Sequence, residues 1–326
     1  MTLASRAPVI IVVGDDPVAT RRTACLLADP DATILIGDAE QLMVRRERPE
    51  LHVIGMDPQL VEIEPECPCC VQRLDLIIVL RQLTARNRIP APIIVVADGD
   101  ADVAAIVQTL LGDPDLRRRT FLDGVVVAVA AVAASTRVAL SLPIGEGPMS
   151  SQHRAMADAI VVTDAERLTS AGQVDLRHEL RSENPTAAVV ITSDRSIGRD
   201  LCLGLRAFSP EGTAAQLRRC RSDAYVNRSG EEFVRLDVSG DLVLSQLEGW
   251  LDALHESVGA ELLRIQGELA VAGEDNVWCV WGTRSTLEIC EGRCWGADAR
   301  VSRLVLVGRG LAHAELLASL QRSIGA

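Results

Sequence analysis

The chain has 326 residues, of which 48% are hydrophobic and 24% charged, and its formal net charge is -12. These proportions exclude a disordered, collagen-like or low-complexity protein, and the length is sufficient for two hydrophobic cores. The negative charge argues against wholesale wrapping of nucleic acid. Lysine is absent from the sequence, which excludes a Schiff-base lysine and the lysine of a phosphate-binding loop.

Export and membrane segments are not expected. The apolar run 9–13 is too short for the hydrophobic region of an export signal and ends in Gly14-Asp15-Asp16. The longest apolar stretch, 124–134, is too short to span a bilayer and is typical of a buried strand. We therefore expect a cytoplasmic protein, in which the nine cysteines are free thiols or metal ligands.

The first two thirds of the chain alternate short apolar runs with helical patterns. Strands are predicted at 9–13, 32–36, 93–97, 125–129, 160–162 and 187–191. Amphipathic stretches between them, such as 74–85 and 102–111, predict helices. Continuous Val and Ile runs separated by helices indicate an α/β domain with a mostly parallel sheet covered on both faces, over residues 1–208.

A second domain is expected after a polar segment. Residues 209–231 are rich in Arg, Ser and Gly and are interpreted as a linker. Beyond it, strands are predicted at 233–238, 262–269, 277–280 and 304–307, and helices at 242–257 and 312–323. This order predicts a small α+β domain over 232–326, with helices on one face of its sheet.

The densest chemical motif is Cys67-Pro68-Cys69-Cys70. Three thiols in four residues provide soft ligands for zinc once they are deprotonated. In extended backbone Cys69 and Cys70 point opposite ways, so they need not bind one ion. A fourth ligand can come from a glutamate in 62–66, from a distant residue or from a client protein. The alternative is a redox-active or inert thiol cluster.

A second group of cysteines, Cys279, Cys290 and Cys294, lies among tryptophans in the sequence. Cys290 and Cys294 are spaced like half of a metal site, but no other half is evident. We favour small apolar cysteines packed beside tryptophan in a core.

Several motifs together resemble the CobW family. They are the Cys67–Cys70 motif with its flank Val71-Gln72-Arg73-Leu74, the strand Leu122-Asp123-Gly124-Val125-Val126, Gln152 with Ala157-Asp158, Asn184-Pro185-Thr186-Ala187, and Arg264-Ile265-Gln266-Gly267 with Leu304-Val305-Leu306-Val307-Gly308. The resemblance implies a P-loop NTPase-like domain followed by a CobW C-terminal domain. It also implies GTP hydrolysis and, for many members, delivery of zinc or cobalt.

The phosphate loop departs from the family pattern. Where the family has a Gly-rich turn ending in Lys and Thr, this chain has the segment 14–23, in which Pro17 lacks an amide donor and Thr20 replaces the lysine. At the family's Asn-Lys-x-Asp, it has Thr163-Asp164-Ala165-Glu166. The degenerate nucleotide site that remains consists of Gly14, Arg21, Arg22 and Thr23. We expect little use of GTP and magnesium and predict no catalytic residue.

One branch of the family resembles this chain further. These are actinobacterial members, expressed in zinc starvation, that recruit a ribosome hibernation factor. The resemblance implies a metal-responsive zinc-homeostasis adaptor whose partner is a protein client or ribosome-associated factor. Arginine clusters at 45–48, 117–119 and 218–221 can contact RNA or form ordinary solvated helix faces. The alternative function is that of an active GTP-hydrolysing zinc metallochaperone.

Overall fold

The computed structural model describes residues 6–28, 32–36, 50–53, 68–85, 89, 91–97, 99–145, 149–192, 199–220, 222–284 and 286–325; side chains of 50–53 and 68–75 are not described. The described chain divides into two compact units. The first comprises residues 1–181 and 187–205, and the second comprises 182–186 and 206–326. None of the described helices is long and apolar enough to cross a bilayer.

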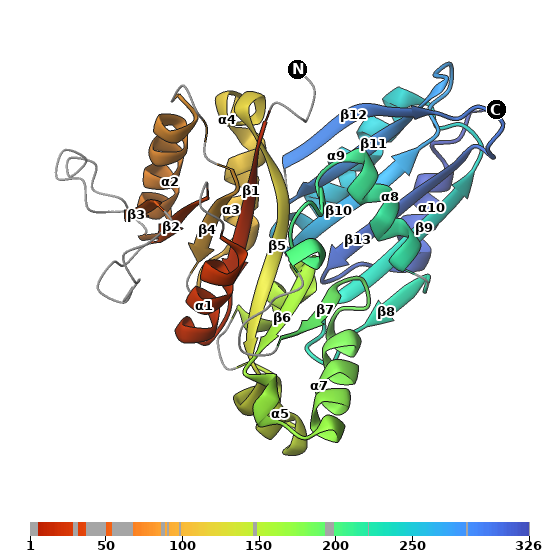
Figure 1. Cartoon of the computed structure of the whole chain (residues 1–326). Helices are drawn as coiled ribbons and strands as arrows, with labels where there is room; N and C mark the ends of the chain where they lie inside the picture. Colours follow the sequence, from red (N-terminus) through yellow and green to blue (C-terminus); the bar gives the residue numbers. More distant parts are fainter. Residues whose placement is uncertain are drawn as a thin grey trace. The chain divides into compact units, whose positions relative to one another are not determined.

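The first unit is a layered α/β domain (Figure 1). Its strands are β1 (Ala7–Val13), β2 (Thr33–Ile36), β3 (Glu50–Val53), β4 (Ile93–Ala97), β5 (Thr120–Ala130), β6 (Ala159–Thr163) and β7 (Ala188–Ile191). Its helices are α1 (Pro17–Leu27), α2 (Pro68–Thr84), α3 (Val103–Gly112), α4 (Pro114–Arg119), α5 (Ala131–Ala139), α6 (Ser150–Met156) and α7 (Ser170–Glu183), with short 3₁₀ turns η3 (Ala165–Arg167) and η4 (Arg199–Leu201).

Within the described residues, the seven strands form one parallel sheet in the order β3-β2-β4-β1-β5-β6-β7. Both faces of β1 are buried, as a parallel strand covered on two sides requires. Ala24 and Leu27 of α1 pack on one face against Ile10 and Val12. The predicted α/β architecture is therefore confirmed.

The strand predicted at 125–129 lies wholly within β5, but the longer apolar stretch around it is not strand throughout. The apolar stretch 124–134 continues as strand only to Ala130, and Ala131 begins α5. Hydrophobicity alone does not separate a buried strand from the buried start of a helix, and the alanines here are good helix formers.

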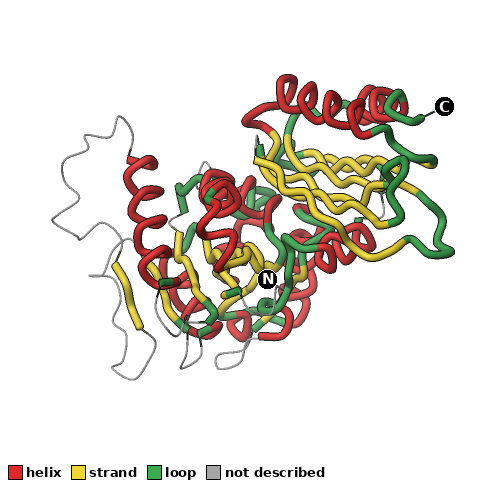
Figure 2. Tube along the Cα trace, turned by 90° about the horizontal axis from the view of Figure 1, so that it is seen from above, coloured by secondary structure: helices red, strands yellow, loops and turns green. Residues whose placement is uncertain are grey.

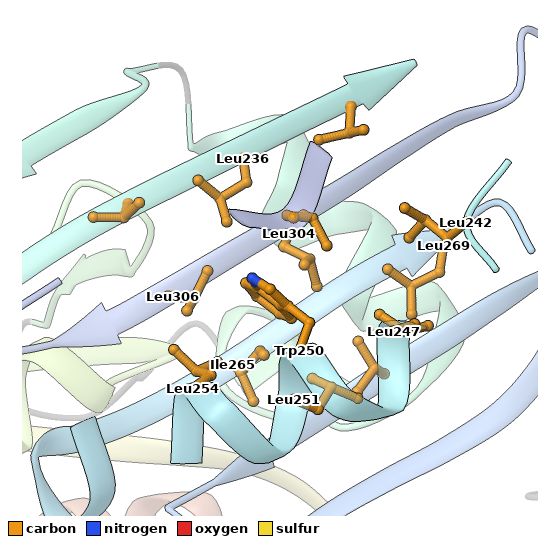
Figure 3. Close-up of a cluster of buried hydrophobic side chains, with 14 of the residues drawn as sticks. Leu236, Leu242, Leu247, Trp250, Leu251, Leu254, Ile265, Leu269, Leu304 and Leu306 are labelled. Atoms are coloured by element: carbon orange, nitrogen blue, oxygen red, sulfur yellow. The ribbon is translucent and has the colours of Figure 1, made fainter. Parts of the chain in front are cut away.

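The second unit is built on an antiparallel sheet (Figure 2). Its elements are α8 (Pro210–Arg219), β8 (Ala224–Val226), β9 (Glu232–Ser239), α9 (Leu244–Val258), η5 (Gly259–Glu261), β10 (Leu262–Leu269), β11 (Asn276–Thr283), β12 (Thr286–Cys294), β13 (Val301–Gly308) and α10 (His313–Gln321). Among the described residues the sheet order is β12-β11-β10-β13-β9-β8. Alternating residues of the strands pack against α9 and α10, with Trp250 at the centre of the cluster (Figure 3).

The segment interpreted as a linker, 209–231, contains α8 and β8 and belongs to the second unit. Ser209 caps α8 and Pro210 occupies its first position, two signals that favour a helix start. Arg235 of β9 donates to the carbonyl oxygens of Leu217 (3.2 Å) and Cys220 (2.7 Å) at the end of α8. Val234 and Leu236, on either side of Arg235, face α9, so Arg235 and α8 lie on the opposite face of the sheet. Helices therefore cover both faces of this sheet, whereas the sequence predicted helices on one face only.

Candidate functional site

A cavity of about 530 Å³ opens in the first unit where the strand order reverses. β4 and β5 flank β1 there, and ligands of parallel α/β sheets bind at the carboxyl ends of such strands. The cavity is lined by the β1–α1 turn, the ends of β4 and β5, α5 and α6, through Gly14, Asp15, Asp16, Pro17, Gly99, Asp100, Val127, Ala128, Val129, Ala130, Ala133, Ala134, Arg137, Ile144, Gly145, Ser150, His153 and Arg154.

The start of α1 is closed by its own side chains. Oδ1 of Asp16 accepts hydrogen bonds from the amides of Val18 and Ala19, both at 2.8 Å. Pro17 has no amide hydrogen, and the amide of Thr20 donates to the Asp16 carbonyl at 3.0 Å. The first-turn amides that bind anions at other helix N-termini therefore already have internal acceptors.

Thr20, which stands where the family has a lysine, points back into the turn. The hydroxyl of buried Thr20 donates to the carbonyl oxygens of Asp16 (2.8 Å) and Gly14 (3.3 Å). Gly14 itself is required by packing, because a Cβ there would lie 2.3 Å from the carbonyl oxygen of Ala128 on β5. In the described residues of this turn, the amides of Val18, Ala19 and Thr20 thus have internal acceptors, and residues 14–20 include no cationic side chain.

The predicted nucleotide-binding residues do not converge. Gly14 lines the cavity, whereas Arg21, Arg22 and Thr23 are not among its lining residues. Arg22 pairs with Asp164, with 2.5 Å between Nη1 and Oδ1, and Thr23 is fully buried. Asp164 has a left-handed φ of 56° at the start of the segment that replaces the guanine-reading motif.

Helix α6 supplies the other polar wall of the cavity. Ser150 donates to Oδ2 of Asp15 at 2.6 Å, and Arg154 donates to the Ser150 hydroxyl. Nε2 of His153 lies 2.7 Å from the carbonyl oxygen of Ala101, so Nε2 carries the proton. Burial lowers the pKa of His153 below its usual value, against the opposing effects of the Ala101 hydrogen bond and Asp15.

Ser150, His153 and Arg154 were not predicted as site residues from the sequence. Their spacing of three and four residues places them on neighbouring positions of a helix surface, which is the one signal that was available. Nothing in the local sequence predicts that this surface meets the β1–α1 turn. The cavity carries three aspartates, Asp15, Asp16 and Asp100, against Arg137 and Arg154.

The predicted zinc ligands fall largely outside the described residues. Cys67 lies outside them altogether, while the backbone of Cys69 and Cys70 forms the first turn of α2 rather than extended chain. In the part of the chain that the structure describes, no three His, Cys, Asp or Glu side chains are grouped to hold a metal ion.

The second cysteine group is split between core and surface. Cys279 and Cys290 face each other across β11 and β12, and Cys294 is exposed. Burial raises the pKa of Cys279 to about 12, which keeps it a neutral thiol. The buried, apolar role that we favoured therefore holds for Cys279 and not for Cys294.

The arginine clusters lie on helix ends where they are described. Arg117, Arg118 and Arg119 form the last turn of α4, and Arg118 pairs with Asp115 in the same helix. Arg218 and Arg219 end α8. The cluster 45–48 and Arg221 lie outside the described residues.

Comparisons with known families cover most of the chain. Residues 28–191 match the model described as "CobW/HypB/UreG, nucleotide-binding domain". Residues 232–324 match the "Cobalamin synthesis protein cobW C-terminal domain".

Curated relatives span similar lengths. The "Zinc chaperone CobW" of Pseudomonas aeruginosa is 26% identical over 285 residues, which cover 82% of this chain and 75% of that protein. A Sinorhizobium protein of the same name is 24% identical and covers 77% of each chain. The "Zinc chaperone YjiA" of Escherichia coli is 23% identical, covering 80% of this chain and 81% of the relative.

A crystal structure of the Zn(II)-bound YjiA GTPase from E. coli superposes with a TM-score of 0.68. The superposition covers 98% of this chain and 99% of the other at 17% identity, so it concerns the fold.

Proposed function

The chain belongs to the CobW family, and we propose that it is a zinc-homeostasis protein, a metal-responsive adaptor whose nucleotide cavity no longer cycles GTP. The observation that carries this proposal is the self-capped start of α1, where Asp16 takes the amides that a phosphate would need. The match to the nucleotide-binding family model begins at residue 28, after this turn.

Energetics support the loss of GTP cycling. Hydrogen bonds to charged groups contribute about 1.5 to 3 kcal/mol each. Each 1.4 kcal/mol changes a dissociation constant about tenfold. The missing lysine and the occupied amides of Val18 and Ala19 are together expected to lower the affinity for GTP by several orders of magnitude.

Zinc is the ligand that the relatives' names indicate, and the chain's own donors fit it. Thiolates at Cys67, Cys69 and Cys70 are the soft ligands that zinc prefers, and their deprotonation couples binding to proton release. In this proposal, zinc occupancy of these thiols changes what the protein binds, without a step of nucleotide hydrolysis.

The competing function is that of a GTP-hydrolysing zinc metallochaperone. It is favoured by the E. coli relative, whose crystal structure is described as a Zn(II)-bound GTPase. Isothermal titration with GTP and Mg²⁺ separates the two. We expect no binding heat and no phosphate release from a sample whose cooperative thermal unfolding shows that it is folded. Micromolar binding with turnover would reject the adaptor.

The zinc site is tested by competition with a chromophoric chelator. The double variant Cys67→Ser, Cys70→Ser is expected to lose zinc affinity by at least tenfold. Cys294→Ser removes an exposed thiol elsewhere and serves as the matched control. Full zinc affinity in the double variant would dismiss this metal site.

A further inference from the structure

The cavity is bridged by a carboxylate from its own wall. Asp15 belongs to the β1–α1 turn and Ser150 to the start of α6, 135 residues further along the chain. Oδ2 of Asp15 accepts the Ser150 hydroxyl proton at 2.6 Å, and the Ser150 oxygen in turn accepts from Nη1 of Arg154. We call these three residues the Asp15 clasp.

The clasp joins an exposed carboxylate to two buried side chains: Asp15 is exposed, whereas Ser150 and Arg154 are buried. Arg154 is 2% exposed, so its guanidinium charge lies inside the unit. A Cβ added to Gly145 would lie 1.9 Å from Oδ2 of Asp15 and 1.7 Å from the Ser150 oxygen. Only glycine therefore allows the chain at 145 to approach the two side chains. The Ser150 hydroxyl, supported by the buried guanidinium of Arg154, is a donor of the kind that binds an anion, and here that anion is the Asp15 carboxylate.

We propose that the Asp15 carboxylate is a built-in anion that takes the place of a phosphate in this cavity and holds α6 to the end of β1 without any nucleotide. The inference rests on the proposed function, in which GTP is not cycled, and it specifies how the cavity is kept in one state. A polyphosphate that enters this cavity is repelled by the negative charge of Asp15, whereas a cradle without this carboxylate would attract it.

The clasp is tested by a double-mutant cycle on the full chain. Asp15→Ala and Ser150→Ala each remove one side of the same contact, so each is expected to lower the thermal midpoint by about 4 °C. The double variant is expected to fall no further than either single variant, because coupled residues are not additive. Shifts that add up would overturn the clasp.

Asp100→Asn is the matched control. Its carboxylate lines the same cavity, but it makes no hydrogen bond or ion pair with the described residues. It should leave the midpoint unchanged. Hydrogen exchange adds a local measurement: in Asp15→Ala the amides of 150–156 should exchange faster than in wild type, while those of α9 keep their protection. Unchanged exchange at 150–156 would also overturn the clasp.

The anion part has its own test with inorganic pyrophosphate as the probe. Millimolar pyrophosphate should raise the midpoint of Asp15→Ala and leave wild type unaffected. No rise in the variant, or an equal rise in both, would overturn the role of Asp15 as an anion substitute. GTP turnover by wild type would reject the proposed function instead. Additive shifts of the thermal midpoint in a protein that neither binds nor hydrolyses GTP would reject the clasp alone.

Discussion

A single carboxylate, that of Asp16, satisfies two amides at the start of α1. Asp16→Ala should lower the free energy of unfolding by about 1 kcal/mol, the usual cost of losing a helix N-cap. Urea denaturation measures the change. Asp16→Asn keeps a good capping side chain and should stay close to wild type; equal losses in the two variants would show that charge, rather than capping, matters here.

The second prediction at this scale concerns pH. Burial lowers the pKa of His153 in the folded protein, so the unfolded chain binds this proton more tightly. Above pH 6.5 His153 is neutral in both states and does not affect stability. As the pH falls below about 6.5, the pKa of the unfolded state, the unfolded chain takes up the proton more readily and the free energy of unfolding decreases. We expect the stability of wild type to fall more steeply between pH 7 and 5 than that of His153→Gln, measured by urea unfolding.

His255→Gln, in which an exposed histidine of α9 is lost, is the control for this experiment. Parallel pH curves for wild type and His153→Gln would contradict the prediction.

Site residues could be predicted from the sequence only where they belong to one continuous segment of the chain. Gly14 was predicted from the resemblance to the family's phosphate loop, and it does line the cavity. Arg22 carries the right charge, but it contacts Asp164 instead. Ser150 and Arg154 join the site through tertiary contacts, and no spacing in the sequence relates them to Asp15.

Among the elements, β10 shows how close packing constrains one position. A Cβ at Gly267 would lie 2.3 Å from Cδ2 of Leu304 and 2.5 Å from the carbonyl oxygen of Arg303 on β13. Gly267→Ala should therefore destabilise the protein by roughly 1 to 3 kcal/mol through overpacking. Thermal or urea unfolding measures the change.

Gly249→Ala is the matched control, because this glycine lies within α9 and a Cβ there would have nothing within 4 Å. It should stabilise the helix by about 0.5 to 1 kcal/mol. A tolerated Gly267→Ala would show that β13 can move away from β10.

Element prediction succeeded where hydrophobic periodicity is strong. The strand expected at 262–269 is β10, Leu262–Leu269, and the helix expected at 102–111 is α3 with Asp102 as its cap. The missed strand β12 has half-exposed and charged residues, since it lies at the sheet edge. Its pairing with β11 supplies what its composition does not indicate.

At the scale of the whole molecule, the partner remains the open proposal. If the protein recruits a factor to ribosomes, it should co-sediment with ribosomes from zinc-starved cells and be depleted from those of zinc-replete cells. The double variant Cys67→Ser, Cys70→Ser should abolish this difference between the two conditions. Absence from the ribosomal fraction in both conditions would count against such a partner.

The short stretch Ser182–Thr186 matters for anyone who dissects the chain. It precedes β7 of the first unit yet belongs to the second. There, Ser182 and Glu183 offer carbonyl oxygens to the Tyr225 hydroxyl and the Asn227 amide, and the Thr186 hydroxyl accepts from Gln216 at 2.8 Å. A C-terminal fragment that starts at residue 206 would leave the donors of Tyr225, Asn227 and Gln216 without these acceptors. A truncated C-terminal unit should therefore include residues 182–186.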